Sequence, residues 1–263
     1  MSRLKLITYT NLNEHQDLIA HFCSTKVGGV SKDAYASLNL GLFTDDVPEN
    51  IAENRNLLCH ELGIPLSCLH NAHQTHGKKV KVIDRSFLQL PLDKRQAELE
   101  GFDALITNIP QQCVTVTTAD CVPILLYDKE NQVVAAVHSG WRGTLENICA
   151  ETVAVMQTRF NTKPQHLVAA IGACISQPKY EVGRELYVGF AELGFNTDAL
   201  FIQTANEKYL FDVRQAVLLE LQTLGISNIE VSPYCTYSDN NLFFSARRLG
   251  NDSGRLLSGI FLK

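Results

Sequence analysis

The sequence lacks the marks of several large protein classes. It has no Cys-x-x-Cys pair, which disfavours a zinc finger and a thioredoxin-like redox site. It has no run of basic residues, and its formal net charge is -5 at pH 7, so nucleic acid is not an expected partner. No segment approaches the roughly eighteen apolar residues that span a bilayer, so no membrane association is expected. Small molecules are the expected partners, and no protein partner is implied.

The N-terminal segment also lacks an uninterrupted apolar stretch of signal-peptide length, which predicts a cytoplasmic protein. Eight cysteines are spread through the 263 residues. Without a secretory signal we expect them to be reduced and most of them to be small core residues.

No internal repeat, low-complexity tract or linker divides the chain, and charge is evenly mixed along it. We therefore expect a single domain over residues 1–263. With 45% hydrophobic and 19% charged residues, this domain can bury a substantial core. The mixed order of predicted strands and helices is typical of an α/β (α+β) fold, a layered domain of mixed β-sheets flanked by helices.

Short segments rich in apolar and β-branched residues predict strands at 4–9, 19–25, 79–83, 104–107, 113–118, 123–127, 133–138, 167–171, 229–231, 242–245 and 257–262. Apolar residues at helical spacing predict helices at 46–63, 144–160, 179–193 and 211–224. Thr144 is the expected N-cap of the second helix. The long loop 28–41 contains glycine, serine and asparagine, and long loops inside compact domains are often functional.

A cysteine and a histidine lie at the ends of two neighbouring predicted strands. Cys121 precedes the strand 123–127, and His138 ends the strand 133–138 just before a glycine turn. If these strands pair as a hairpin with its loop at 129–132, Cys121 and His138 become neighbours. His76, in the segment Gln-Thr-His-Gly, has to be added by the fold. Two imidazoles and one thiolate leave a fourth position open, as in catalytic zinc sites.

Each of these residues also has a simpler interpretation. A lone cysteine at a strand end is more often an inert core residue, and a lone histidine before glycine is more often a loop residue. A Cys-His pair is also compatible with a nucleophile, in which the imidazole lowers the pKa of the thiol. Spacing alone does not separate a metal ligand from a nucleophile.

Several motifs together resemble the YfiH family, the laccase-domain proteins now regarded as purine nucleoside phosphorylases. They cover nearly the whole chain, and the combination of HG, ADC and VHxGWRG elements is highly specific. The matching segments are TKVGGVSKDAYASLNLG (25–41), ENRNLL (53–58), QTHG (74–77), TTADCVPILLYD (117–128), AVHSGWRGT (136–144), IGACISQPKYEVGREL (171–186), CTY (235–237), and FFSARR followed by SGR (243–255).

The resemblance implies a single domain related in fold to the catalytic domain of cytotoxic necrotizing factors. It implies a zinc site of His76, Cys121 and His138, which would also carry the catalysis. It further implies phosphorolysis of adenosine, inosine, guanosine and methylthioadenosine to base and pentose 1-phosphate, and deamination of adenosine. For deamination, zinc would activate water for attack on the purine carbon that bears the amino group. Older family descriptions are copper polyphenol oxidase and peptidoglycan editing factor, so copper is the second candidate metal.

Residues near these motifs are candidates for substrate and phosphate. Arg142 and Arg55 suit phosphate because a guanidinium matches its oxygens, although Arg55 fits a structural ion pair equally well. Lys26 stands where many relatives have arginine and offers only a point charge. Asn39 is a candidate for the substrate or for a turn. Asp120 is a candidate catalytic residue that orients an imidazole or transfers a proton. A purely structural role in the turn before Cys121 is almost equally expected.

The C-terminal arginines and one further cysteine have weaker signals. Arg247, Arg248 and Arg255 either line an anionic pocket or lie on a solvated face, and we expect the solvated face for at least two of them. Cys174 is expected to be a packing residue.

Two alternative enzymes remain open. A copper phenol oxidase is disfavoured because the eight histidines form no recognisable pairs. A metal-free Cys-His amide hydrolase of cell-wall processing predicts covalent trapping of Cys121 without dependence on chelators. A non-enzymatic binding protein is less expected, because a structural zinc normally acquires a fourth protein ligand.

Overall fold

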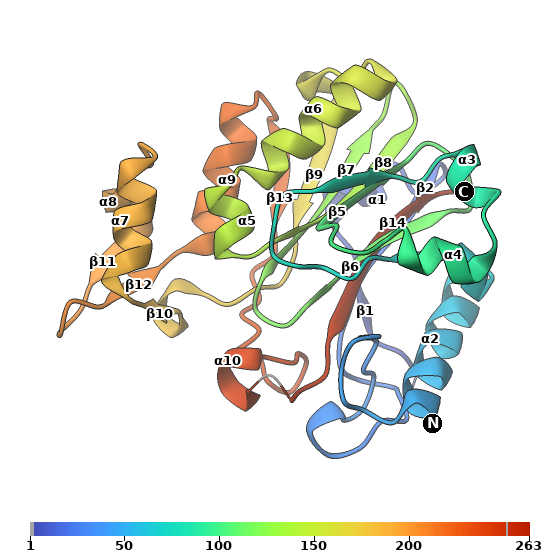
Figure 1. Ribbon diagram of the computed structural model, residues 1–263, viewed down its shortest axis with the longest axis horizontal. Helices are drawn as coiled ribbons and strands as arrows, with labels where there is room; N and C mark the ends of the chain where they lie inside the picture. The colour runs from blue at the N-terminus through green and yellow to red at the C-terminus, as the bar shows by residue number, and fades with distance from the viewer. Residues whose placement is uncertain (1–2, 251) are drawn as a thin grey trace.

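Two β-sheets packed face to face form the centre of the molecule (Figure 1). A computed structural model describes residues 3–250 and 252–263. The first sheet has the strand order β13 (Asn228–Val231), β9 (Leu167–Ile171), β7 (Val122–Asp128), β8 (Val133–Ser139), β5 (Ala104–Thr107) and β4 (Val80–Val82). The second has the order β1 (Leu6–Ile7), β2 (Ile19–Ser24), β14 (Leu256–Leu262), β6 (Cys113–Thr118) and β3 (Leu69–Asn71). Both sheets mix parallel and antiparallel pairs.

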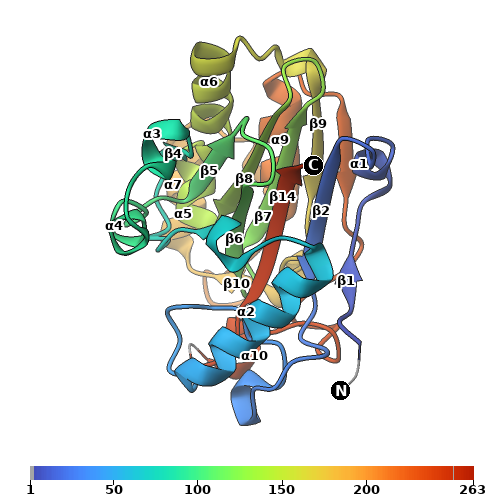
Figure 2. The same ribbon diagram turned by 90° about the vertical axis from the view of Figure 1, so that its right-hand side faces the viewer.

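Helices cover the outer faces of both sheets, which gives four layers (Figure 2). The helices α5 (Trp141–Leu145), α6 (Ile148–Phe160) and α9 (Val213–Thr223) pack on the six-stranded sheet. The helix α2 (Pro48–Leu62) packs on the five-stranded sheet. The predicted α/β class with layered mixed sheets is therefore confirmed.

Strand β7 shows why the central strands are apolar at every position. Ile124 and Leu126 point to the helices, whereas Leu125 and Tyr127 point to the other sheet. Successive side chains of a strand alternate between its faces, and here both faces are buried. An unbroken apolar run is the result.

A third, smaller sheet stands beside this body (Figure 1). It contains β10 (Glu181–Val182), β12 (Tyr209–Phe211) and β11 (Phe201–Gln203), next to α7 (Arg184–Glu192) and α8 (Thr197–Leu200). Phe190, Phe201 and Phe211 pack together inside it. The remaining helices are α1 (Thr10–Asn13), α3 (Arg85–Leu88), α4 (Leu92–Ala97) and α10 (Ala246–Leu249), with 3-10 turns η1 (Asp33–Tyr35), η2 (Leu66–Cys68), η3 (Pro164–His166) and η4 (Gln177–Lys179).

The predicted hairpin is confirmed. Strands β7 and β8 pair antiparallel from Val122 opposite Ser139 to Asp128 opposite Val133, with the loop at 129–132. Strands 104–107, 113–118 and 167–171 have the predicted bounds, and the predicted helix 46–63 is α2.

Four local predictions are wrong. The helix 144–160 is divided into α5 and α6, because Asn147 is left-handed at φ 59°. Thr144 lies inside α5 and is not an N-cap; its hydroxyl donates to the Gly140 carbonyl. The helix predicted from 179 begins only at Arg184, after β10. The segment 242–245 contains a turn and no strand, and its apolar character reflects the buried rings of Phe243 and Phe244.

No helix among the described residues 3–250 and 252–263 has the length and apolar character to cross a membrane. All eight cysteines are free, and six of them are buried.

Candidate metal centre

Three segments bring His76, Cys121 and His138 together at one end of the six-stranded sheet. Their ligand atoms all lie within 4.8 Å of one another. In the hairpin, His138 is paired with Pro123, so Cys121 just before β7 lies near the end of β8. His76 comes from the loop before β4, and its ring centroid is 4.8 Å from that of His138 at an interplanar angle of 81°. Sequence could predict the hairpin contact but not the addition of His76.

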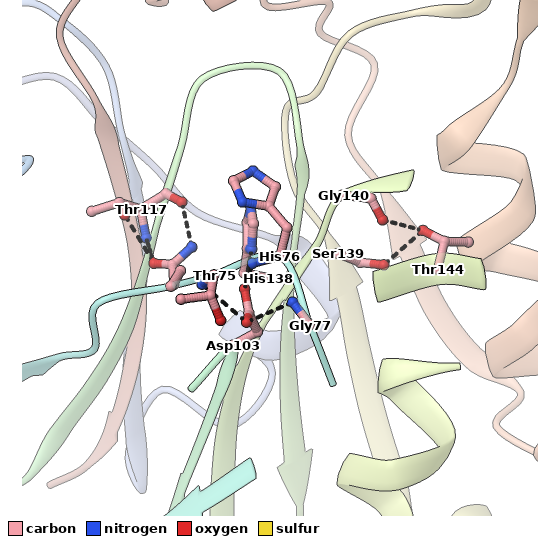
Figure 3. Close-up of polar contacts among 10 residues, drawn as sticks. Thr75, His76, Gly77, Asp103, Thr117, His138, Ser139, Gly140 and Thr144 are labelled. Carbon is pink, nitrogen blue, oxygen red and sulfur yellow. Dashed lines mark hydrogen bonds and ion pairs between the residues drawn. The ribbon is translucent and has the colours of Figure 1, made fainter. Parts of the chain in front are cut away.

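Asp103 fixes the orientation of His138 (Figure 3). Its Oδ1 lies 2.8 Å from His138 Nδ1, and both side chains are buried. When His138 is neutral, Nδ1 donates to this carboxylate and Nε2 keeps a lone pair for a ligand. A carboxylate behind a histidine is the usual support of a metal-binding imidazole.

The same carboxylate holds the loop that carries His76. The backbone N–H groups of Thr75, His76 and Gly77 donate to Asp103 at 3.2, 2.9 and 2.9 Å (Figure 3). His76 is left-handed, with φ 61°, a conformation that is uncommon for residues other than glycine. Asp103 therefore positions two of the three clustered side chains.

Gln74 connects this loop to the second sheet. Its amide donates to the Thr117 carbonyl at 2.9 Å and accepts from the Thr117 N–H at 2.7 Å. The pair extends the hydrogen bonding at the end of β6, so the loop is fixed at both sheets.

Gly140 leaves room for the cluster. A Cβ at this position would lie 3.0 Å from Cys121 Sγ and 3.1 Å from His76 Cδ2. These contacts are tighter than side chains normally make, so a larger residue would displace the thiol or the ring.

Cys121 and His138 each stabilise the charged form of the other. Burial would raise the pKa of Cys121, but the charge and hydrogen bond of His138, with a smaller contribution from His76, lower it to about 6. Burial would lower the pKa of His138, but the Cys121 thiolate and Asp103 raise it to about 9. Cys121 is thus a thiolate near neutral pH, the form that binds metal or attacks carbon.

The donor set fits zinc. A thiolate and two imidazoles, one of them supported by a carboxylate, are the ligands that zinc prefers, and three protein ligands leave one position for water or substrate. Among the described residues, this is the one group of three such side chains that could hold a metal ion.

The cluster lines a cavity of about 470 Å³, within the usual range for small-molecule sites. Side chains from both sheets and from the loops at their ends contribute to it. Its lining comprises Gly41, Leu42, Phe43, Thr44, His73, Gln74, His76, Thr117, Thr118, Ala119, Asp120, Cys121, His138, Gly140, Trp141, Ile175, Tyr180, Val213, Ala246, Arg247 and Arg255.

The candidate phosphate and substrate residues are placed differently from one another. Arg142 is exposed, with its guanidinium 4.7 Å from the centre of the Trp141 ring, which lines the cavity. Arg55, Lys26 and Asn39 are not in the cavity lining.

Arg55 and Asn39 use their side chains in contacts that stabilise the fold. Arg55 is a buried residue of α2, and its guanidinium donates to the Leu40 carbonyl at 3.0 Å. Asn39 is also buried; its amide donates to Thr44 and Asp46, and its oxygen accepts from the Gly41 and Arg255 N–H groups. Asn39 thus stabilises a turn, the second of the two roles expected for it. Lys26 is half-buried, and its backbone N–H donates to the Leu242 carbonyl.

Asp120 lines the cavity, but the expectation that it orients an imidazole is wrong. Its two oxygens accept from the Thr236 hydroxyl at 2.6 Å and the Arg247 N–H at 2.7 Å, and Asp103 orients His138 instead. Asp120 has φ 99°, an unusual conformation that these contacts hold in place. It joins the Cys121 turn to α10.

Sequence reasoning missed Asp103, Trp141 and Phe43, and it undervalued two arginines. Arg247 and Arg255 both line the cavity. Arg247 and Arg248 are exposed, as expected for at least two of the three C-terminal arginines, whereas Arg255 is half-buried. Arg248 is exposed and lies over the Tyr237 ring. The occurrence of Arg247 and Arg255 within the matched C-terminal motifs was the available signal.

Comparisons with known proteins identify the family of the chain. Residues 20–263 match the family model described as multi-copper polyphenol oxidoreductase laccase. The chain is 37% identical to a purine nucleoside phosphorylase of Bacteroides thetaiotaomicron, over 98% of this chain and 96% of that one. It is 37% identical to adenosine deaminase RL5 of an unknown prokaryotic organism, over 92% and 93% of the two chains.

A solved structure gives the same result at the level of the fold. The crystal structure of the hypothetical protein YfiH from Bacillus licheniformis superposes with a TM-score of 0.90, 27% identity and coverage of 100% of both chains. The chain therefore belongs to the YfiH family of laccase-domain proteins.

Proposed function

We propose that this protein is a zinc-dependent purine nucleoside phosphorylase that also deaminates adenosine, acting in the cytoplasm on adenosine, inosine, guanosine and methylthioadenosine. The observation that carries the proposal is the open donor set of His76, Cys121 and His138 on the wall of a cavity large enough for a small molecule. Relatives named for both activities support it.

In phosphorolysis, a phosphate oxygen forms a bond to C1′ of the nucleoside and the bond between C1′ and the base breaks. The base leaves with the electron pair and takes up a proton, and the sugar leaves as pentose 1-phosphate. The chain must bind the phosphate dianion and keep it beside C1′, because correct placement of two reactants removes much of the barrier.

Positive side chains in the cavity suit that task. Arg247 and Arg255 line it, and guanidinium groups match phosphate oxygens in pairs. Arg142 is not in the lining, but its guanidinium lies 4.7 Å from the centre of the Trp141 ring, which is. These positions favour an anion site of Arg247 and Arg255, with Arg142 as an additional contact.

Deamination uses the same cluster. A water oxygen bonds to the purine carbon that carries the amino group, the carbon–nitrogen bond breaks, and the amine leaves as ammonia after taking up a proton. His76, Cys121 and His138 would hold the zinc, which when bound supplies electrophilic activation of an oxygen at its open position. Asp103 keeps Nε2 of His138 directed at this site.

The test is the fate of adenosine with and without phosphate. The wild-type protein is expected to release adenine only with phosphate and to form inosine without it, and both products should disappear in Cys121→Ala. Cys68→Ala removes another half-buried thiol outside the cavity and should keep both activities. Formation of neither product by the wild-type protein would overturn the proposal.

A metal-free amide hydrolase is the second candidate, because Cys121, His138 and Asp103 also form a nucleophile–base–carboxylate row. The low pKa of Cys121 beside His138 suits attack on a carbonyl. This function predicts alkylation of Cys121 and amide hydrolysis that chelators leave unchanged. If added zinc protects Cys121 from alkylation, the result favours the phosphorylase over the hydrolase.

A further inference from the structure

An exposed aromatic ring stands at the wall of the cavity. Phe43 is 51% exposed and its neighbour Leu42 is 38% exposed, yet both line the cavity with the His76 and Cys121 side chains. Ligand pockets are lined mainly by hydrophobic and aromatic side chains, with a few polar groups that orient the ligand. The roles assigned to the cluster and to the arginines do not use this ring.

The segment that carries Phe43 is held by hydrogen bonds at both ends. Asn39 donates to the Thr44 hydroxyl at 2.9 Å and to Asp46 at 3.0 Å, and the Gly41 N–H donates back to Asn39 at 3.1 Å. The Thr44 hydroxyl also donates to the Gly41 carbonyl. Because both ends are fixed, the tip at Leu42 and Phe43 is presented in a defined place.

A second ring supports Phe43. The His73 ring lies 4.0 Å from it, centre to centre, at an interplanar angle of 31°. His73 is in turn fixed, because its Nδ1 lies 2.6 Å from Glu100 and its N–H donates to the Leu99 carbonyl. His73 also lies three residues before His76, so the aromatic pair and the metal cluster share one loop.

We propose that Phe43, supported by His73, stacks against the purine base and sets the affinity of the site for nucleosides. The proposal rests on the proposed function. A purine presents a flat π surface that pairs well with a half-exposed phenyl ring. A base on Phe43 lies in the same cavity as the ligand cluster and the arginines Arg247 and Arg255.

The stacking also accounts for breadth of substrate. Stacking depends on the ring system and hardly on its substituents, so adenine, hypoxanthine and guanine bases are all accepted. Phe43 acts in binding and touches no reacting bond. Its loss therefore changes the KM for nucleosides, whereas kcat and the KM for phosphate stay near their wild-type values.

Steady-state kinetics of Phe43→Ala, Phe43→Tyr and Val47→Ala test the proposal. Phe43→Ala is expected to raise the KM for adenosine and inosine about tenfold, and Phe43→Tyr to restore it to within about twofold, because a base stacked on an aromatic ring contributes a factor of this order. Val47→Ala is the matched control, since Val47 is 53% exposed, lies four residues away and does not line the cavity.

Binding is measured separately from turnover with the one tryptophan of the chain. Trp141 lines the same cavity, so its fluorescence reports ligands there without a signal from any other tryptophan. Adenosine should bind about tenfold more weakly to Phe43→Ala, whereas ribose 1-phosphate, which has no base, should bind equally to both proteins.

The outcomes separate the two proposals. Unchanged adenosine affinity in Phe43→Ala, with wild-type turnover intact, overturns the stacking and leaves the phosphorylase. Equal weakening of ribose 1-phosphate also overturns it, because the loss is then one of general structure. Wild-type protein that binds adenosine through Phe43 but turns over no nucleoside overturns the enzyme function and keeps the stacking.

Discussion

Asp103 has the largest number of roles of any single side chain at the candidate metal centre. It is completely buried, receives three backbone N–H groups from the loop of His76, and lies in hydrogen-bond contact with His138. Burial raises its pKa, but the contacts with His138 and with these N–H groups outweigh burial and lower it. It is therefore ionised at neutral pH, as a support of metal-binding histidines must be.

Asp103→Asn should lower the affinity for zinc about 10- to 100-fold, because His138 loses its charged support and the His76 loop loses acceptors. Competition with a chromophoric chelator measures this affinity. Asp120→Asn is the matched control, since Asp120 lies next to Cys121 and binds Thr236 and the Arg247 backbone. Equal losses of affinity in the two variants would contradict the role given to Asp103.

Gly140→Ala should weaken zinc binding about tenfold while the protein remains folded, because the new methyl group lies 3.0 Å from Cys121 Sγ and shifts the thiol. The same chelator competition and a circular dichroism spectrum check both parts. Gly189→Ala in α7 meets only an ordinary contact at 3.7 Å and should keep full affinity. Wild-type affinity in Gly140→Ala would show that the site tolerates a side chain there.

The boundaries of helices and strands can be predicted from the sequence where the residues at the boundary determine them. Pro48 begins α2 and Gly63, at φ 68°, ends it, as expected from the rigid ring of proline and the freedom of glycine. Sequence does not reveal the break at Asn147 or the three-residue strands β11 and β12. Their hydrogen bonds are few, and aromatic packing around Phe201 and Phe211 holds them.

The side chain of Glu220 links the helices α9 and α6 through a buried carboxyl group. It belongs to α9, is 8% exposed, and its Oε1 accepts from the Ala150 N–H in the first turn of α6 at 3.0 Å. Its other oxygen, Oε2, is buried without a partner among the described residues. Burial outweighs the hydrogen bonds of the carboxyl with Ala150 and Cys149 and raises the pKa of Glu220 to about 7.

This carboxyl predicts a dependence of stability on pH. Between its unfolded pKa near 4.5 and its folded pKa of about 7 the native state binds more protons, so the free energy of unfolding falls as pH rises through that window. Glu220→Gln should remove the decline, and its advantage over wild type should grow to about 3 kcal/mol above pH 7. Urea unfolding across this range measures it.

Glu192→Gln is the control for the Glu220 experiment, because Glu192 is an exposed residue at the end of α7. Its effect on stability should be small at every pH. A Glu220→Gln advantage that stays constant with pH would show that Glu220 is not protonated in the folded protein.

Across the whole molecule, the grouping of His76, Cys121 and His138 could be predicted from the sequence, but the residues around it could not. His76, Cys121 and His138 stand in specific motifs, so the resemblance gives them directly. Asp103 lies 35 residues before His138 in a stretch with no motif, and only the pairing of β5 with β8 brings them together. Arg255 and Phe43 meet at the cavity because β14 and the loop 39–46 lie side by side, a long-range contact with no local signal.

Zinc should stabilise the entire fold, because the cluster joins the loop before β4, the turn before β7 and the end of β8. Zinc at about 100 times its dissociation constant should add about 2.7 kcal/mol to the free energy of unfolding. Thermal unfolding with zinc and with chelator measures this difference. The difference should vanish in Cys121→Ala and persist in Cys68→Ala; a difference retained in Cys121→Ala would place the metal elsewhere.

Whether His76, Cys121 and His138 hold zinc is measured by native mass spectrometry of the purified protein, with the metal identified by elemental analysis. We expect one zinc ion per wild-type chain and none in Cys121→Ala. A metal-free wild-type chain that resists zinc loading, and whose Cys121 is alkylated equally with and without zinc, would contradict it.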